Sequence, residues 1–283
     1  MATVRRAARA GSFYEATATG LRAQIEWAFC HPQGPGRLPA VDPAGPRRLA
    51  GLVVPHAGYA YSGPVAAYAY AALAADGAPD LAVLVGPNHY GLGPAVSVSL
   101  AEGWQTPLGV VACDRAVVEA IVACLPGPAT GELAHEREHS LEVQLPFLQY
   151  LYGDALSLVA IAVGHLALEE AEGLGRAIAT ALAGRNAVVI ASSDLSHYES
   201  QRTAQTKDRR ALDAILAGDD ARLLQLAATE MSLCGAGPVV AALTATRQLG
   251  AEGRQLLKYA TSGDVAGDMR QVVGYAALSL GRA

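Results

Sequence analysis

The sequence predicts an α/β protein, built as a single three-layer α/β/α domain around a mixed, largely parallel central sheet. Short apolar runs alternate with longer helical segments along the 283 residues, which is typical of strand–helix units. Three of these runs, at 49–54, 81–85 and 188–191, end in a polar loop that carries a histidine. Because ligands bind beyond the carboxyl ends of strands in open α/β sheets, the same loops predict a binding site.

The expected elements follow in order from the apolar runs, the capping residues and the turn residues. Strands are expected at 49–54, 81–85, 95–100, 108–112, 156–163, 188–191, 256–261 and 272–280. Helices are expected at 19–29, 64–75, 115–124, 140–152, 168–182, 202–217, 219–228 and from 238 onward. Pro64 suits a first helical turn, Asp114 can cap the helix after it, and Pro146 should lie near the start of its helix or kink it. No linker divides the chain, so residues 1–283 are predicted to form one domain.

Composition excludes several classes of function. The net charge is −5, and no run of Lys or Arg exceeds two residues, so we expect no nucleic-acid partner. The longest apolar stretch, 155–163, is too short to span a bilayer. The four cysteines have irregular spacings without a Cys-x-x-Cys pair, which favours reduced thiols and a cytoplasmic protein.

Two histidines follow consecutive predicted strands. His56 lies in Pro-His-Ala-Gly-Tyr after the first strand, and His89 lies in Gly-Pro-Asn-His-Tyr after the second. Imidazole is the commonest neutral metal ligand. Either histidine alone could cap its strand and form local hydrogen bonds. Their shared position at two strand ends favours a common metal site.

Cys234 lies in Cys-Gly-Ala-Gly-Pro, just ahead of a predicted helix. The N–H groups and dipole at a helix N-terminus favour a thiolate, which is the form that binds a metal or acts as a nucleophile. The alternative is a small buried apolar residue, the usual state of cysteine. The flanking glycines indicate a turn and favour the functional interpretation.

Two further pairs are candidates for supporting roles. Asp194 and His197 share the loop after 188–191, where the carboxylate could orient an imidazole or a substrate and His197 could be a general acid/base or a further ligand. The alternative is a capping Asp and a surface His. His139 and Glu142 are three apart and share a face if both are helical. They could donate or accept hydrogen bonds from metal ligands, or simply cap their helix.

Seven segments together resemble the Memo family. They are Gly-Ser-Phe-Tyr at 11–14, Pro-His-Ala-Gly-Tyr-Ala-Tyr-Ser-Gly at 55–63, Gly-Pro-Asn-His-Tyr at 86–90, Glu-His-Ser-Leu-Glu-Val-Gln-Leu-Pro at 138–146, Ser-Ser-Asp-Leu-Ser-His-Tyr at 192–198, Cys-Gly-Ala-Gly-Pro at 234–238 and Tyr-Ala-Thr-Ser-Gly-Asp at 259–264. The resemblance covers nearly the whole chain in order, and the combination is highly specific.

The resemblance implies a LigB-like fold, that of class III extradiol ring-cleaving dioxygenases. It also implies a metal site of two His and one Cys, which fall here on His56, His89 and Cys234. His197, beside Asp194, falls where those dioxygenases hold a catalytic His. Those enzymes use two His and a carboxylate, a set suited to Fe(II) and O₂, so the cysteine puts ring cleavage in doubt. The prokaryotic members, of the AmmeMemoRadiSam system protein B type, are associated with an AMMECR-type protein and a radical-SAM protein.

We therefore expect a cytoplasmic metal-binding protein with a mononuclear site, in which iron is favoured and copper or zinc are alternatives. As an enzyme it would be an oxidoreductase with dioxygenase-like chemistry on a small molecule. One alternative is a non-catalytic metal carrier or a peptide-binding adaptor. Another is a metal-free cysteine hydrolase with Cys234 as nucleophile, His197 as base and Asp194 as orienting group.

Overall fold

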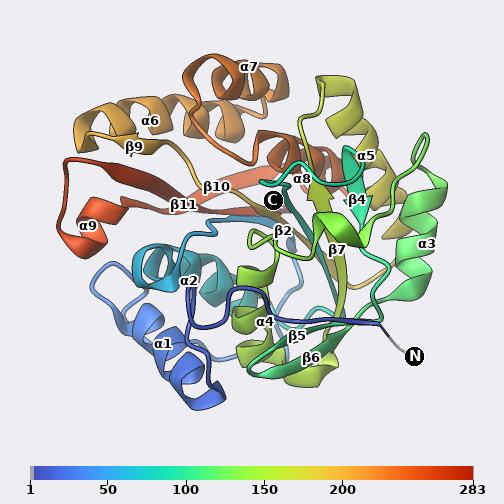
Figure 1. The fold of residues 1–283 in the computed structure, drawn as a ribbon, viewed down its shortest axis with the longest axis horizontal. Coiled ribbons are helices and arrows are strands. Elements are labelled where there is room, and N and C mark those ends of the chain that lie inside the picture. The colour runs from blue at the N-terminus through green and yellow to red at the C-terminus, as the bar shows by residue number, and fades with distance from the viewer. Residues whose placement is uncertain (1–2, 283) are drawn as a thin grey trace.

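Four parallel strands form the centre of the sheet in the computed structural model, which describes residues 3–282 (Figure 1). They lie in the order β2 (Leu49–Val54), β8 (Ala187–Ser192), β3 (Leu81–Pro87) and β7 (Ser157–Val163). Almost every residue of these strands is buried, as in parallel sheets that are covered on both faces. The predicted largely parallel sheet is therefore confirmed.

Antiparallel strands extend the sheet on both sides. On the β2 side, β11 (Val272–Gly281) pairs with β2, and β10 (Gly253–Thr261) and the short β9 (His197–Glu199) both pair with β11. On the other side, β4 (Val96–Val98) pairs with β7. A separate small sheet contains β1 (Val4–Arg5), β5 (Gly103–Thr106) and β6 (Gly109–Ala112). The short strands β1, β5 and β9 were not predicted from the sequence.

Helices cover both faces of the sheet (Figure 1). One face is covered by α1 (Ala18–Cys30), α2 (Tyr59–Ala75) and α4 (Leu145–Tyr152). The other face is covered by α3 (Arg115–Ala123), α5 (Leu168–Ala181), α6 (Gln201–Ala217), α7 (Asp220–Glu230) and α8 (Ala236–Gln248), and α9 (Ser262–Ala266) is a single short turn before β11. Among the described residues, no helix combines the length and apolar character that crossing a membrane requires.

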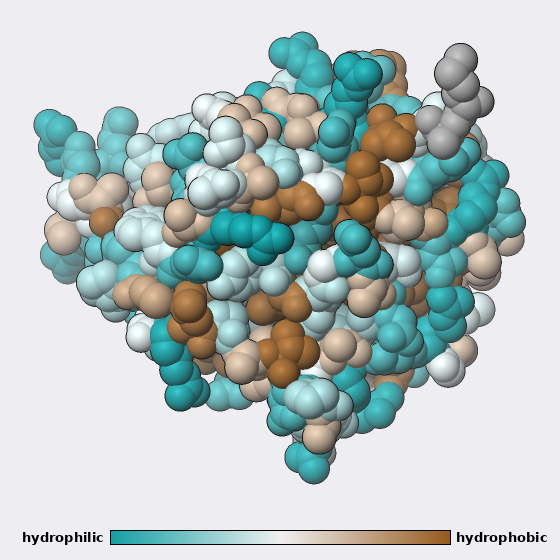
Figure 2. Space-filling model, turned by 90° about the horizontal axis from the view of Figure 1, so that it is seen from below, coloured by the Kyte–Doolittle hydropathy of each residue, from teal (hydrophilic) through white to brown (hydrophobic). Residues whose placement is uncertain are grey.

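Two hydrophobic cores result from the alternation of side chains along the central strands. Leu52 of β2 and Leu84 of β3 point into the core beneath α1, α2 and α4. Their neighbours Val53 and Val83 point into the core beneath α5 and α8. Each such fully buried aliphatic side chain stabilises the fold by about 1.5–3 kcal/mol. On the outer face shown in Figure 2, apolar residues form small separate patches among polar ones, which is normal for a protein surface.

Two helix starts differ from the predictions, and each involves a proline. The helix expected at Pro64 begins five residues earlier at Tyr59, so Pro64 lies inside the helix, in its second turn, where it has no N–H to donate to the residue four positions earlier. The helix expected at 140–152 begins at Leu145, where Pro146 occupies the first turn. Residues 142–144 form a 3₁₀ turn instead, so His139 and Glu142 do not share an α-helical face.

The strand order brings the candidate loops together. β8 lies between β2 and β3, with Val54 beside Ser192 and Val85 beside Ala191. The three strands therefore end at nearly the same level of the sheet. The loops that follow them leave the same edge side by side, which is where open α/β sheets bind ligands.

Candidate metal centre

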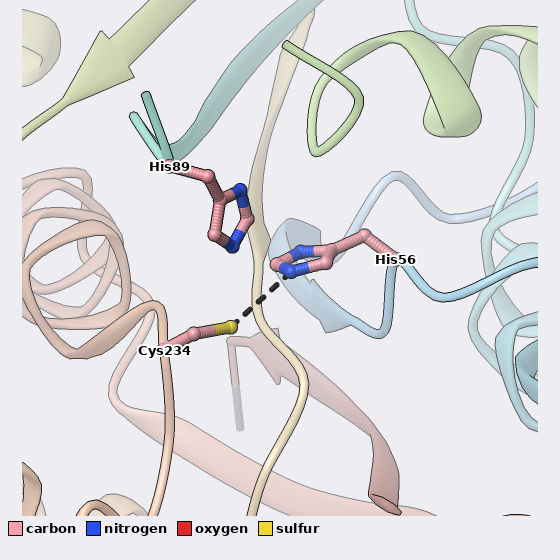
Figure 3. A group of neighbouring side chains, drawn as sticks. All are labelled: His56, His89 and Cys234. Carbon is pink, nitrogen blue, oxygen red and sulfur yellow. Dashed lines mark hydrogen bonds between the residues drawn. The ribbon is translucent and has the colours of Figure 1, made fainter. Parts of the chain in front are cut away.

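The side chains of His56, His89 and Cys234 point toward one another (Figure 3). They come from the loop after β2, the loop after β3 and the turn before α8. One ligand atom from each lies within 4.8 Å of the others, and Cys234 Sγ lies 3.2 Å from His56 Nε2. Ligands bound to one metal at roughly 2.0–2.3 Å lie about 3–4 Å apart. The structure thus brings the three predicted residues together in a group that could hold a metal ion.

Hydrogen bonds around Ser192 fix the tautomer of His56. The Ser192 hydroxyl donates to the carbonyl of Ser140 at 2.6 Å and accepts from Gln144 Nε2 at 2.8 Å. Since its single proton is used, the His56 Nδ1 atom, 2.9 Å away, must donate to it. The lone pair of His56 then lies on Nε2, toward Cys234. Burial and the nearby charge of His89 hold the pKa of His56 well below its usual value, so the ring is neutral, as a metal ligand requires.

Glu138 holds His89 in the same tautomer. One carboxylate oxygen accepts from His89 Nδ1 at 2.9 Å and from the backbone N–H groups of His139 and Ser140, both at 2.9 Å. The other oxygen accepts from the backbone N–H of His89 at 2.7 Å. Burial alone would raise the pKa of Glu138, but the hydrogen bond and charge of His89 outweigh it and hold that pKa at about 2. A carboxylate bonded to an imidazole in this way orients metal-binding histidines.

Sequence reasoning missed Glu138 as a residue of the site. Its signal was weak, because an acidic residue next to His139 has no spacing that marks it as a partner of His89, 49 positions earlier. Only the loop after β3 and the approach of 138–140 to it create the contact. Ser140 holds the segment 138–140 against this loop, because its hydroxyl donates to the carbonyl of Pro87 at 2.9 Å.

Cys234 reaches the site through a tight turn against β8. Its backbone N–H donates to the carbonyl of Asp194 at 3.3 Å, and its Sγ lies 3.6 Å from the same oxygen. A Cβ atom on Gly235 would lie 2.5 Å from the carbonyl oxygen of Ser192, so the turn needs glycine. Burial, together with the charge of Asp194, raises the pKa of the Cys234 thiol well above its usual value. The thiol is therefore neutral until a cation replaces its proton.

Asp194 and His197 both lie near the candidate ligands, but they are not joined to each other by a hydrogen bond within the described residues. Asp194 Oδ1 accepts from the backbone N–H of His56 at 2.7 Å. Burial raises the pKa of Asp194 to about 6. His197 begins β9 and is partly exposed, and its charge acts on both Asp194 and His56. Asp194 thus orients the loop of His56 rather than the ring of His197.

A strained residue follows His197. Val273 of β11 lies opposite His197 and Val272 lies opposite Glu199, which leaves Tyr198 as the extra residue of a β-bulge. Tyr198 has a φ of 58° and is 75% exposed. The left-handed conformation costs a non-glycine residue about 1–2 kcal/mol. Strained residues of this kind cluster at functional sites, and this one is the direct neighbour of His197.

The structure separates the predicted pair His139 and Glu142. The His139 ring stacks on His89 with ring centroids 4.5 Å apart and meets His56 edge-on at 5.4 Å. Burial lowers the pKa of His139 to about 3. Glu142 instead binds the N-terminal segment, and its carboxylate accepts hydrogen bonds from Arg5, Ala8, Arg9 and Tyr14. Because no common helix carries them, His139 lies against the candidate ligands and Glu142 does not.

The remaining histidines differ in burial. His31, His135 and His165 lie in sequence contexts that mark no site, and such histidines are expected at the surface. His165 is exposed and His31 is partly exposed. His135 is fully buried, with Nε2 2.9 Å from the carbonyl oxygen of Ser97 and its ring edge-on to Trp104. The expectation for His135 was therefore wrong, because its apolar neighbours come from distant parts of the chain.

Comparisons with known proteins agree with the fold and with the motifs. The family described as Memo-like protein matches residues 5–279. MEMO1 family protein MK0963 of Methanopyrus kandleri is 47% identical over 272 residues, covering 95% of this chain and 96% of its own. MEMO1 family protein MTH_45 of Methanothermobacter thermautotrophicus is 47% identical over 279 residues, covering 98% and 100%.

A solved structure supports the fold alone. It is that of the uncharacterized protein JW3007 from Escherichia coli K12, which superimposes with a TM-score of 0.54 at 16% sequence identity. The match covers 83% of this chain and 100% of that one. The family match over nearly the whole length and the two relatives at 47% identity confirm the resemblance seen in the motifs. The chain belongs to the Memo family.

Proposed function

We propose that this protein binds one metal ion through His56, His89 and Cys234 and carries out metal-dependent redox chemistry on a small substrate. The observation that carries the proposal is the meeting of three ligand atoms within 4.8 Å. Both imidazoles are already held with the proton on Nδ1, by Ser192 and Glu138, so both Nε2 atoms are available. Iron is the favoured metal, and copper or zinc also accept two imidazoles and a thiolate.

The bound ion would supply a Lewis-acid or redox-active centre of the dioxygenase-like type. The chain's own residues would position it and manage protons. Ser192 and Glu138 orient the two rings, and the turn at Gly235 presents the sulfur. His197 would take or give a proton near Asp194, on whose carboxyl group the charge of His197 acts.

One observation bears on the metal-free cysteine hydrolase. The imidazole beside the thiol is that of His56, with Nε2 3.2 Å from Cys234 Sγ, whereas His197 makes no hydrogen bond to the thiol within residues 3–282. Burial raises the pKa of the thiol and lowers that of His56. Both shifts oppose the thiolate–imidazolium pair that activates a cysteine nucleophile. These shifts favour metal binding over hydrolysis.

The proposal extends to the cellular compartment, the fold family and the partners of the protein. Cys30, Cys113, Cys124 and Cys234 are free, which suits a reducing cytoplasm. Because the chain belongs to the Memo family, we also propose a LigB-like fold and a functional association with an AMMECR-type protein and a radical-SAM protein.

Loading the chelated protein with Co²⁺ tests the ligand set. We expect one ion per chain and a thiolate-to-cobalt charge-transfer band. Cys234→Ser should lose the band and bind cobalt weakly. Cys124→Ser, at an exposed thiol after α3, is the matched control and should retain both. A band that persists in Cys234→Ser would refute the assignment.

A second experiment tests catalysis. His197→Ala should keep the metal stoichiometry and lose about 10²–10⁴-fold of any metal-dependent O₂ consumption, the usual contribution of a positioned acid/base. His31→Ala, on the remote end of α1, should change neither. Loss of the metal in His197→Ala would make His197 a ligand. If no catechol or other reducing substrate consumes O₂ faster than the free metal does, the carrier or adaptor replaces the redox enzyme.

A further inference from the structure

A cavity of about 610 Å³ adjoins the candidate metal centre. His89 and Cys234 form part of its wall, so the cavity reaches two of the three candidate ligands. The rest of the wall comes from the loops after β3 and β7, from α7 and from the first turn of α8. Cavities of about 300–1,000 Å³ are typical of small-molecule sites.

Helix α7 has two apolar faces, and one of them borders the cavity. Leu223 and Leu226 are buried in the core beneath α7. Ala221, Leu224 and Ala228 lie three and four residues apart, share a second face and line the cavity. A surface helix normally carries charged or polar residues opposite its buried stripe. The second apolar face of α7 therefore borders the cavity, and Leu224 packs against the edge of the core as well.

The cavity wall lacks formal charge. Among the described residues, no Asp, Glu, Lys or Arg side chain lines it. Its polar side chains, besides the candidate ligands, are those of Asn88, His165 and Gln225. The amide of Asn88 donates to the carbonyl of Leu92, and that of Gln225 accepts from Arg222. Apart from a metal ion bound at Cys234 and His89, a charged ligand would meet no counter-ion here, and its loss of hydration would be costly.

We propose that this cavity is the substrate site beside the metal centre and that it takes a neutral, mainly apolar small molecule. The proposal rests on the proposed function, and it adds the chemical class of the substrate. The apolar part of the molecule lies against Leu224, Leu233 and the second face of α7. Its reacting end lies toward Cys234 and His89.

Two dyes of matched shape test the proposal. N-phenyl-1-naphthylamine is neutral, and 8-anilino-1-naphthalenesulfonate has the same rings with an added sulfonate. In metal-free protein we expect one neutral dye per chain, bound at least about 10-fold more tightly than the sulfonate because no Lys or Arg side chain lines the wall. Ala228→Trp fills the cavity and should weaken the neutral dye at least about 10-fold. Thr229→Trp, on the next exposed position of α7 and outside the cavity, should leave binding unchanged.

A second filled variant, Ala221→Trp, gives the same expected loss from the other end of the α7 face. The thermal midpoints of all three variants identify any that fails to fold. In cobalt-loaded protein, binding of the neutral dye should shift the cobalt absorption bands, because the cavity reaches Cys234. Failure of the neutral dye to bind, equal binding in Ala228→Trp and wild type, preference for the sulfonate, or unchanged cobalt bands would each overturn the proposal. If wild-type protein binds the neutral dye but does not bind cobalt, that result would contradict the proposed function instead.

Discussion

Replacement of Glu138 by Gln tests how the protein prepares His89 to bind a metal. The Glu138 carboxylate accepts from His89 Nδ1, His139 N, Ser140 N and His89 N. A Gln amide has one acceptor oxygen. In its best orientation it keeps the three donors at one oxygen position and turns its NH₂ group toward the backbone N–H of His89. The carboxylate charge that strengthens His89 as a ligand is also lost.

The magnitudes follow from these contacts. One buried N–H without a partner should lower the free energy of unfolding by about 1–3 kcal/mol. Loss of a carboxylate behind a metal-binding histidine should raise the dissociation constant for the metal about 10–100-fold, or about 1.4–2.8 kcal/mol. Competition against a chromophoric chelator measures the affinity, and urea unfolding of metal-free protein measures the stability.

Glu142→Gln is the matched control for this experiment. Glu142 is also a fully buried carboxylate with several donors, but it binds Arg5 and the N-terminal segment. Breaking a buried ion pair should cost about 3–5 kcal/mol of stability, while metal affinity stays near that of wild type. Equal metal affinity in Glu138→Gln and wild type, or equal loss in both variants, would refute the reasoning.

Three further predictions test other parts of the account. Burial lowers the pKa of His135 to about 4 from a usual value near 6.5. As the pH falls, the unfolded chain therefore takes up the proton before the folded chain does. About 3 kcal/mol of stability is present above pH 6.5 and is lost as the pH falls toward 4. His135→Gln should flatten that acid loss in urea titrations of metal-free protein. Tyr198→Gly should raise the free energy of unfolding by about 0.5–1 kcal/mol, because it relieves the left-handed strain and the extra chain entropy of glycine offsets only part of that gain. Tyr198→Ala should give no gain, and a gain in Tyr198→Ala equal to that in Tyr198→Gly would contradict the strain argument. Iodoacetamide should leave Cys234 unmodified in metal-loaded protein and label it after chelation, at a rate that increases with pH. The exposed Cys124 should react in both states. Labelling of Cys234 at the same rate with and without the metal would count against its role as a ligand.

The strands and their loops could be predicted because local signals mark them. Buried runs bounded by Gly, Pro and Ser specify where 49–54 and 81–85 end. The insertion of β8 between β2 and β3 is a matter of strand order, which local patterns do not encode. That order is what brings Asp194 between the loops of His56 and His89.

The hydrogen-bond partners of the candidate ligands were harder to predict. Glu138 and Ser192 act through contacts that span 49 and 136 positions, and only the folded backbone brings them together. Glu142 was expected near the ligands because a helix over 140–152 would have placed it beside His139. Because α4 begins at Leu145, His139 and Glu142 do not lie side by side on a helix. Burial of His135 was missed because Ser97 of β4 and Trp104 of β5 reach it from distant parts of the chain.

Metal analysis of native protein tests the central claim most directly. Protein without an affinity tag, purified under anaerobic conditions and analysed for all transition metals, should contain about one metal ion per chain, with iron predominant. Cys234→Ala should lose this metal, and Cys124→Ala, at an exposed thiol, should retain it. Wild-type protein that stays metal-free after anaerobic reconstitution, or Cys234→Ala that holds as much metal as wild type, would contradict the assignment of His56, His89 and Cys234 as a metal site.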